Sequence, residues 1–112
     1  MSGLNPVRLD GCLFLPGPDE DKEIKVSGGQ EFALALCRII DRGHVAFDQK
    51  DQGLGGVNVF YKSGKVDLVE IGKTGLIRVK GRVPIQTDLS ELMPLLKRLV
   101  KEASTGSPGT GK

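Results

Sequence analysis

The arrangement of apolar and polar positions places several short strands in the middle of the chain. Apolar, strand-forming segments occupy residues 57–61, 65–71 and 76–80, the last with a possible continuation to 85, and glycine-containing turns separate them. Such segments, bounded by turn residues, are typical of β-strands. Because the turns are short, neighbouring strands must be antiparallel. Together with a strand near residue 45, these segments predict an antiparallel β-meander over about residues 44–85.

Two further segments have helical periodicity. In the second of them, over about residues 88–103, apolar residues recur at the i, i+3, i+4, i+7 spacing that marks one face of a helix. They are Leu89, Leu92, Met93, Leu96, Leu99, Val100 and Ala103. The first helix is expected over about 28–42, with Ser27 and Gln30 as a capping box at its start and Gly43 just after its end. Asp88 and Glu91 suggest a similar capping box for the second helix.

The remaining segments complete an α+β fold. Short apolar runs at 11–15 and 23–26 predict an N-terminal β-hairpin, which either joins an edge of the sheet or forms a flap. Residues 1–8 show no periodicity and are expected to be a loose arm. We expect one globular domain over residues 1–103, in which the meander packs against the two helices. Residues 104–112 form a Gly/Ser-rich tail that is expected to be disordered.

The first helix is apolar on almost all of its surface. Phe32, Leu36, Cys37 and Ile40 lie within an almost unbroken apolar stretch. A helix of this kind is either buried on several sides or packs against a second surface. We therefore expect these four residues to form an interface, in a homodimer or with another constant protein partner.

Composition excludes several classes of protein. The chain has 112 residues, a net charge of +2 and two cysteines, too few for a disulfide scaffold or a four-cysteine zinc site. No apolar stretch approaches the length of a membrane span, and the first residues lack the features of a secretory signal. We therefore expect a cytoplasmic protein that does not enter a membrane. No cofactor and no metal site is expected.

Positive charge is concentrated in the second half of the chain. Residues 1–60 carry a balance of −3 and residues 61–112 a balance of +5. Arg78, Lys80 and Arg82 share one parity, so a continuous strand would align them on one face. The basic residues of the meander are Lys62, Lys65, Lys73, Arg78, Lys80 and Arg82. Such a face could follow the phosphates of a single-stranded nucleic acid, and it could equally protect a sheet edge from aggregation.

Candidate catalytic residues are few. His44 is the only histidine and follows the first helix, where a pocket beneath the N-terminal hairpin could use it as a general base. No motif marks a nucleophile, and no catalytic residue is assigned. The first hypothesis is therefore a small non-enzymatic interaction module: an adaptor, assembly or regulatory protein. The alternatives are a nucleic-acid-binding domain that uses the basic sheet face, and a small-molecule binder or enzyme near His44.

Overall fold

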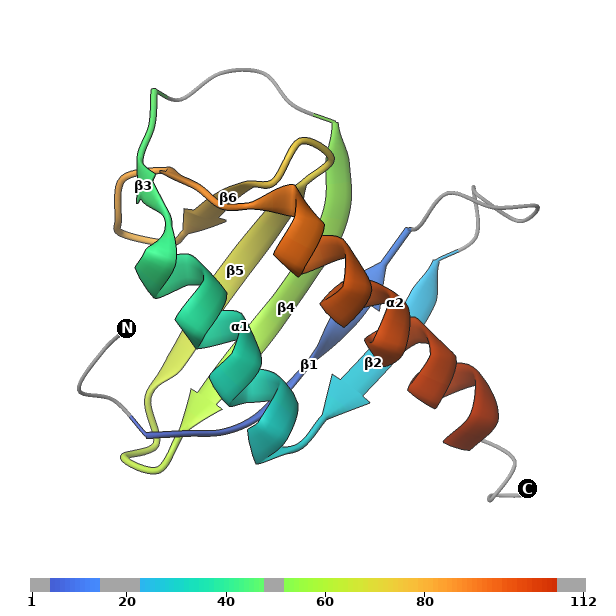
Figure 1. Cartoon of the computed structure of the whole chain (residues 1–112). Coiled ribbons are helices and arrows are strands. Elements are labelled where there is room, and N and C mark those ends of the chain that lie inside the picture. The colour runs from blue at the N-terminus through green and yellow to red at the C-terminus, as the bar shows by residue number, and fades with distance from the viewer. Residues whose placement is uncertain (1–4, 15–22, 48–51, 107–112) are drawn as a thin grey trace.

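The computed structural model describes residues 5–14, 23–47 and 52–106, the last three of these by their backbone alone. Seven strands and two helices follow one another in these segments (Figure 1). They are β1 (Pro6–Leu13), β2 (Ile24–Gly28), α1 (Gln30–Arg42), β3 (His44–Val45), β4 (Gly53–Tyr61), β5 (Val66–Gly72), β6 (Leu76–Val79), β7 (Ile85–Gln86) and α2 (Leu89–Gly106).

All seven strands belong to one antiparallel sheet, in the order β2-β1-β4-β5-β6-β7-β3. The N-terminal hairpin, β1 and β2, joins the meander because β1 pairs with β4 along almost its whole length. Strand β3 lies at the opposite edge, where it pairs with β7. The α+β fold with an antiparallel sheet and two helices is thus confirmed. The expected loose arm is wrong for Pro6–Arg8, which pair with β4 and belong to β1.

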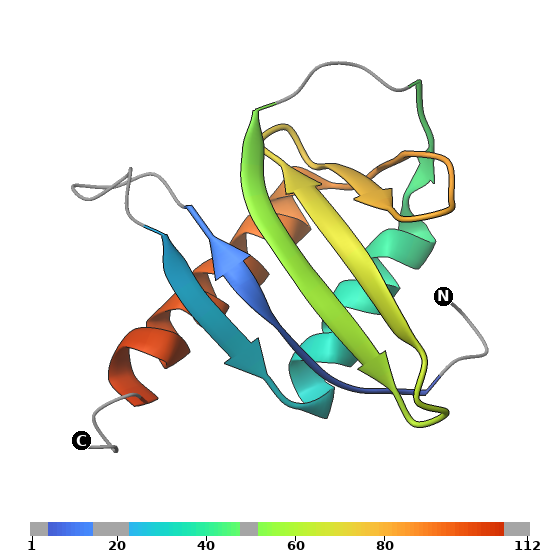
Figure 2. The same ribbon diagram turned by 180° about the vertical axis from the view of Figure 1, so that it is seen from behind.

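Both helices lie on the same face of the sheet, as Figures 1 and 2 show from opposite sides. The core forms between this helical layer and the inward residues of the strands. It includes fully buried leucines from α1, α2 and β1, such as Leu36, Leu96 and Leu9, and the inward valines of β4 and β5. Burial of this apolar surface is the main force that fixes the helices on the sheet. No helix of the described residues lies on the other face of the sheet (Figure 2).

Helix α1 begins two residues later than expected. Ser27 and Gly28 are the last residues of β2, paired with Asp10 and Leu9, so the ladder of the sheet uses the residues that were expected to cap α1. Helix α1 begins at Gln30 after Gly29, and no side chain caps it. The Ser27–Gln30 capping box is therefore wrong.

Asp88 caps α2, but not through the expected capping box with Glu91. Asp88 Oδ1 accepts hydrogen bonds from the backbone amide of Ser90 at 2.9 Å and from its hydroxyl at 2.6 Å. These bonds hold the pKa of the Asp88 carboxyl below its ordinary value. Glu91 instead forms an ion pair with Arg42 of α1. Helix α2 continues to Gly106, three residues beyond the expected end, and residues 107–112 lie outside the described residues.

Strands β1 and β4 approach each other unusually closely near one end of their pairing. A Cβ atom on Gly11 would lie 2.1 Å from the carbonyl oxygen of Gly56, and one on Gly55 would lie 2.1 Å from that of Cys12. Gly55 also has a φ of +130°, a conformation that side-chain-bearing residues rarely adopt. A shift in the β4–β5 register lies at the same place, between Gly53 and Gly55. Glycine at positions 11 and 55 is therefore a requirement of this close approach.

Candidate functional site

The uncovered face of the sheet, called here the open face, presents apolar side chains to solvent. Phe60 of β4 pairs with Val66 of β5, and Asn58 pairs with Leu68, so these side chains lie side by side on the face that Figure 2 shows without a helix in front of it. Val66 is 47% and Leu68 42% exposed, and Phe60 is half-buried. The guanidinium of Arg8 lies 3.7 Å from the centre of the Phe60 ring. We call Phe60, Val66 and Leu68 the open-face strip.

A hollow of about 480 Å³ adjoins this strip. It is lined by Phe14, Gly53, Gly55, Gly56, Leu68, Glu70, Ile71, Gly72 and Arg78. The four glycines have no side chains, so backbone atoms of β4 and β5 form much of its lining. The glycines that let β1 approach β4 therefore also make room on the open face. The hollow offers exposed peptide groups, apolar contacts from Phe14 and Leu68, and one charge of each sign.

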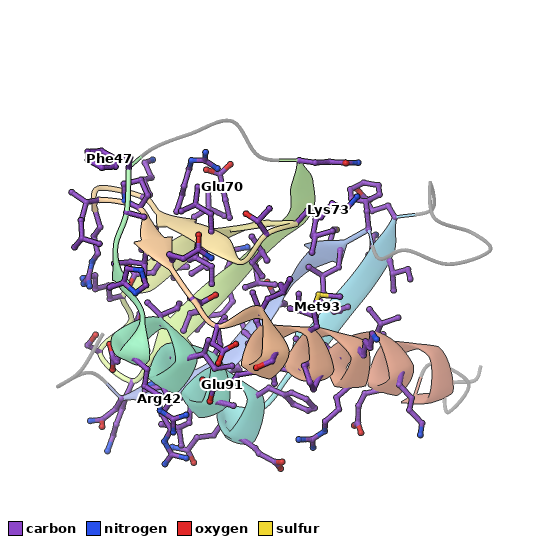
Figure 3. The ribbon with its side chains drawn as sticks, turned by 45° about the horizontal axis from the view of Figure 1, so that its top comes forward. Arg42, Phe47, Glu70, Lys73, Glu91 and Met93 are labelled. Carbon is purple, nitrogen blue, oxygen red and sulfur yellow. The ribbon has the colours of Figure 1, made fainter. Side chains whose placement is uncertain are left out.

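Charged side chains of both signs lie on the open face. Glu70 lies directly opposite Arg78 in the pairing of β5 with β6, and it points away from the helices (Figure 3). On β1, Arg8 Nη1 lies 2.8 Å from Asp10 Oδ2. Each of these two carboxylates therefore has a cation beside it.

The six basic residues expected to bind nucleic acid do not converge on one patch. Lys62 and Lys65 lie at the β4–β5 turn, and Lys73 lies in the β5–β6 turn at the other end of β5, roughly 20 Å away along seven strand residues. Lys65 Nζ is also 4.0 Å from Asp67 Oδ1. Arg78 and Lys80 keep the expected two-residue spacing at β6.

The predicted alignment is wrong for Arg82. Strand β6 ends at Val79, and Gly81, with a φ of +83°, helps to reverse the chain. The backbone amide of Arg82 donates to the carbonyl of Val79 in this turn. Arg82 therefore lies in the turn between β6 and β7, and its parity with Arg78 does not describe one continuous strand.

The four residues expected to form an interface lie inside the chain's own core. Phe32, Leu36, Cys37 and Ile40 are 8%, 1%, 5% and 6% exposed. Helix α1 packs against the sheet and against α2, which accounts for the apolar character of most of its surface. A homodimer stays a prediction, and in this structure these four side chains are not available to a partner.

A buried polar group lies beneath α1. Tyr61 Oη donates a hydrogen bond of 2.8 Å to Asp67 Oδ2. Tyr61 and Asp67 are 3% and 7% exposed. Burial, followed by the bond to Asp67, raises the pKa of Tyr61 far above its ordinary value. Burial likewise raises the pKa of Cys37, so neither group is ionised near neutral pH.

His44 does not occupy the expected pocket. It is exposed on the edge strand β3, in register with Gln86 of β7, and the hollow on the open face does not include it. Among the described residues, no three His, Cys, Asp or Glu side chains gather closely enough to hold a metal ion. In the same part of the chain, no helix is both long and apolar enough to cross a membrane.

Sequence reasoning missed the open-face strip because both parities of β5 are apolar. Val69 and Ile71 point into the core, whereas Val66 and Leu68 point outward, and Asp67 points inward. A strand that is apolar on both faces is usual when both faces are covered. In an antiparallel sheet with only two predicted helices, that pattern is a signal for an apolar surface left exposed.

Comparison of the chain with protein-family models, with curated protein sequences and with solved structures finds no match.

Proposed function

We propose that the chain is a small interaction module that associates with a second copy of itself through the open face of its sheet. The observation that carries the proposal is the open-face strip, in which Val66 and Leu68 are exposed on a face that no helix covers. Antiparallel sheets tolerate one solvated face, but that face is normally polar. Contiguous exposed apolar side chains bordered by charges are typical of interaction surfaces.

The charges support a second copy as the partner. A two-fold interface joins the same surface patch from both subunits, so the patch must be complementary to itself. The open face carries Arg8 beside Asp10 and Glu70 opposite Arg78. After a two-fold rotation, carboxylates of one copy can face guanidinium groups of the other. The expected homodimer would therefore use the open face of the sheet as its interface, and not α1.

Replacement of Leu68 by glutamate is expected to weaken the dimer at least tenfold, because a carboxylate would be buried in the apolar centre of the interface. Sedimentation velocity over a range of protein concentrations measures this change. The matched control is Val45→Glu, which places the same charge on β3 at a position that is 67% exposed and outside the open face. The control is expected to dimerise like the original chain.

Two outcomes would contradict the proposal. One is a chain that stays monomeric up to roughly 1 mM, a concentration at which even a weak dimer is populated. The other is a dimer that Leu68→Glu leaves intact while circular dichroism shows the variant to be folded.

A nucleic-acid-binding module is the second candidate, and the observation in its favour is the pair Arg78 and Lys80 at β6. Lys80 directly follows the last residue of β6, and its backbone amide still donates to the carbonyl of Leu68 of β5. Residues two apart in extended chain lie about 7 Å apart on one face, a spacing at which both can contact one phosphate backbone. Replacing both with glutamate is expected to weaken binding of a labelled single-stranded oligonucleotide about tenfold at low salt. Lys97→Glu on α2, whose side chain is exposed on the helical layer, is the matched control. Equal binding by both variants would remove this candidate.

A further inference from the structure

A groove runs between α1 and α2 on the outer side of the helical layer, away from the open face. It has a volume of about 420 Å³ and is lined by Ala35, Arg38, Ile39, Arg42, Glu91, Pro94, Leu95 and Arg98. Two ion pairs bridge the helices at its ends. Arg42 pairs with Glu91 at one end, and Arg98 Nη2 lies 3.0 Å from Glu31 Oε1 at the other (Figure 3 labels the first pair).

The groove combines an apolar floor with a cationic rim. Ala35, Ile39, Pro94 and Leu95 provide the apolar lining. Three arginines border it, of which Arg42 and Arg98 are paired with Glu91 and Glu31 and leave Arg38 as the excess charge. Arg98 also lies 5.0 Å from the centre of the Phe32 ring, which fixes its guanidinium near the groove.

Arg38 is the cation best placed to receive a ligand. It lies midway along the groove, between the two bridging ion pairs, and its side chain is exposed. Within residues 5–14, 23–47 and 52–103, no ion pair engages it. A solvated arginine above an apolar floor matches a ligand that has an apolar body and a negative charge beside it.

We propose that this groove docks an acidic amphipathic helix from a partner protein. The apolar side chains of the docked helix would enter the groove between α1 and α2. Its carboxylates would face Arg38, Arg42 and Arg98 by charge complementarity. The part of α1 between Glu31 and Arg42 spans roughly 16 Å, which accommodates about three turns of a docked helix. This surface lies on the layer opposite the open face, so the proposal is independent of self-association there.

Fluorescence anisotropy with designed peptides tests the proposal. The probe is a labelled helix of about four turns, with leucines at i, i+3, i+4 and i+7 and glutamates on the flanks. A second peptide carries lysine at each glutamate position. We expect the glutamate peptide to bind at least tenfold more tightly than the lysine peptide, and Arg38→Glu to weaken it about tenfold. Lys25→Glu, an exposed position on edge strand β2, is the matched control and should leave binding unchanged.

A second variant distinguishes docking of the peptide inside the groove from its electrostatic attraction to the arginines around the groove. Ala35→Arg adds a positive charge but fills the floor, so it should weaken the glutamate peptide about tenfold if the helix docks there. Unchanged or tighter binding by this variant would overturn the proposal. So would equal binding of the two peptides, or no binding of either below roughly 1 mM. Binding of phosphatidylserine vesicles that depends on Arg38, without binding of the peptide, would show that the occupant is a lipid headgroup and that the proposal is wrong.

Discussion

Gly55→Ala is expected to lower the free energy of unfolding by about 4 kcal/mol, near the upper limit for single substitutions. Two costs combine at this position. The new Cβ would lie 2.1 Å from the carbonyl oxygen of Cys12, a backbone atom that cannot move without disturbing the β1–β4 pairing. The φ of +130° adds strain, of order 1–3 kcal/mol for a residue with a side chain.

Alanine substitutions at three other glycines distinguish the steric clash with the backbone from the strain of a positive φ. Gly64 has a φ of +94° with open space around its Cβ position, so Gly64→Ala should cost about 1–2 kcal/mol from backbone strain alone. Gly11 meets a backbone oxygen at 2.1 Å without a positive φ, so Gly11→Ala should cost about 2–3 kcal/mol. Gly53 has neither feature, and Gly53→Ala should stay within about 0.5 kcal/mol.

Urea unfolding followed by far-ultraviolet circular dichroism measures all four variants. The expected order of destabilisation is Gly55, Gly11, Gly64, Gly53. If Gly55→Ala and Gly53→Ala were equally stable, the close approach of β1 to β4 would not be present in solution. Because Gly55 also lines the hollow on the open face, the same series shows whether that surface depends on the glycines.

The sequence predicts best those elements whose pattern depends on local geometry. Helix α2 follows from its apolar spacing, and the β4–β5 hairpin follows from its turn and flanking segments, because both signals arise within a few residues. The meander extends where expected through β5 and β6. These elements can be predicted without knowing which other parts of the chain pack against them.

The errors arise where a residue has two uses and distant partners select one. Ser27 is a good helix cap by its chemistry, but pairing with Asp10 makes it part of β2. Glu91 is suited to a capping box by its chemistry, but in the fold it forms an ion pair with Arg42 of α1. The parity of Arg82 suggests an aligned strand, but the turn at Gly81 ends β6 before it. Tertiary contacts decide each case, and a single sequence does not contain them.

The candidate surfaces were predicted less well than the fold for the same reason. The apolar character of α1 indicates that most of its surface is buried, but it does not show whether α1 packs against the chain's own sheet or against a second chain. The residues that the structure leaves exposed, Val66 and Leu68, belong to a strand that the pattern identifies without showing which of its sides is covered. Which side of β5 is buried depends on where the two helices pack against the sheet.

Tyr61→Phe is expected to cost about 2–3 kcal/mol at neutral pH. The substitution keeps the ring but removes the hydroxyl that donates to Asp67 Oδ2, and it leaves a buried carboxylate with an unmet hydrogen-bonding requirement. Lys65, at 4.0 Å from the other carboxylate oxygen, compensates in part. Asn58→Ala on the open face removes a half-buried polar side chain without affecting Asp67, and it is expected to be much milder.

The same hydroxyl makes stability depend on pH in the alkaline range. Tyr61 has its pKa raised in the folded state by burial and by the bond to Asp67, whereas in the unfolded chain it ionises near pH 10. The stabilisation that this shift represents is complete below about pH 10, and it is lost as pH rises towards the folded pKa, because only the unfolded state releases the proton. Tyr61 alone should therefore lower the free energy of unfolding by about 2 kcal/mol between pH 10 and pH 12, because the unfolded tyrosine is already half ionised at pH 10.

Tyr61 reports on its own ionisation, because the chain contains one tyrosine and no tryptophan. The ultraviolet absorbance of tyrosinate is expected to appear in the same step as the loss of circular dichroism, and Tyr61→Phe should show a shallower loss of stability above pH 10. Burial also raises the pKa of Cys37, so a Cys37→Ser variant measures the part of the alkaline loss that belongs to the thiol. A tyrosine that titrates near pH 10 while the chain stays folded would mean that its hydroxyl is solvated, and the buried Tyr61–Asp67 bond would then be absent in solution.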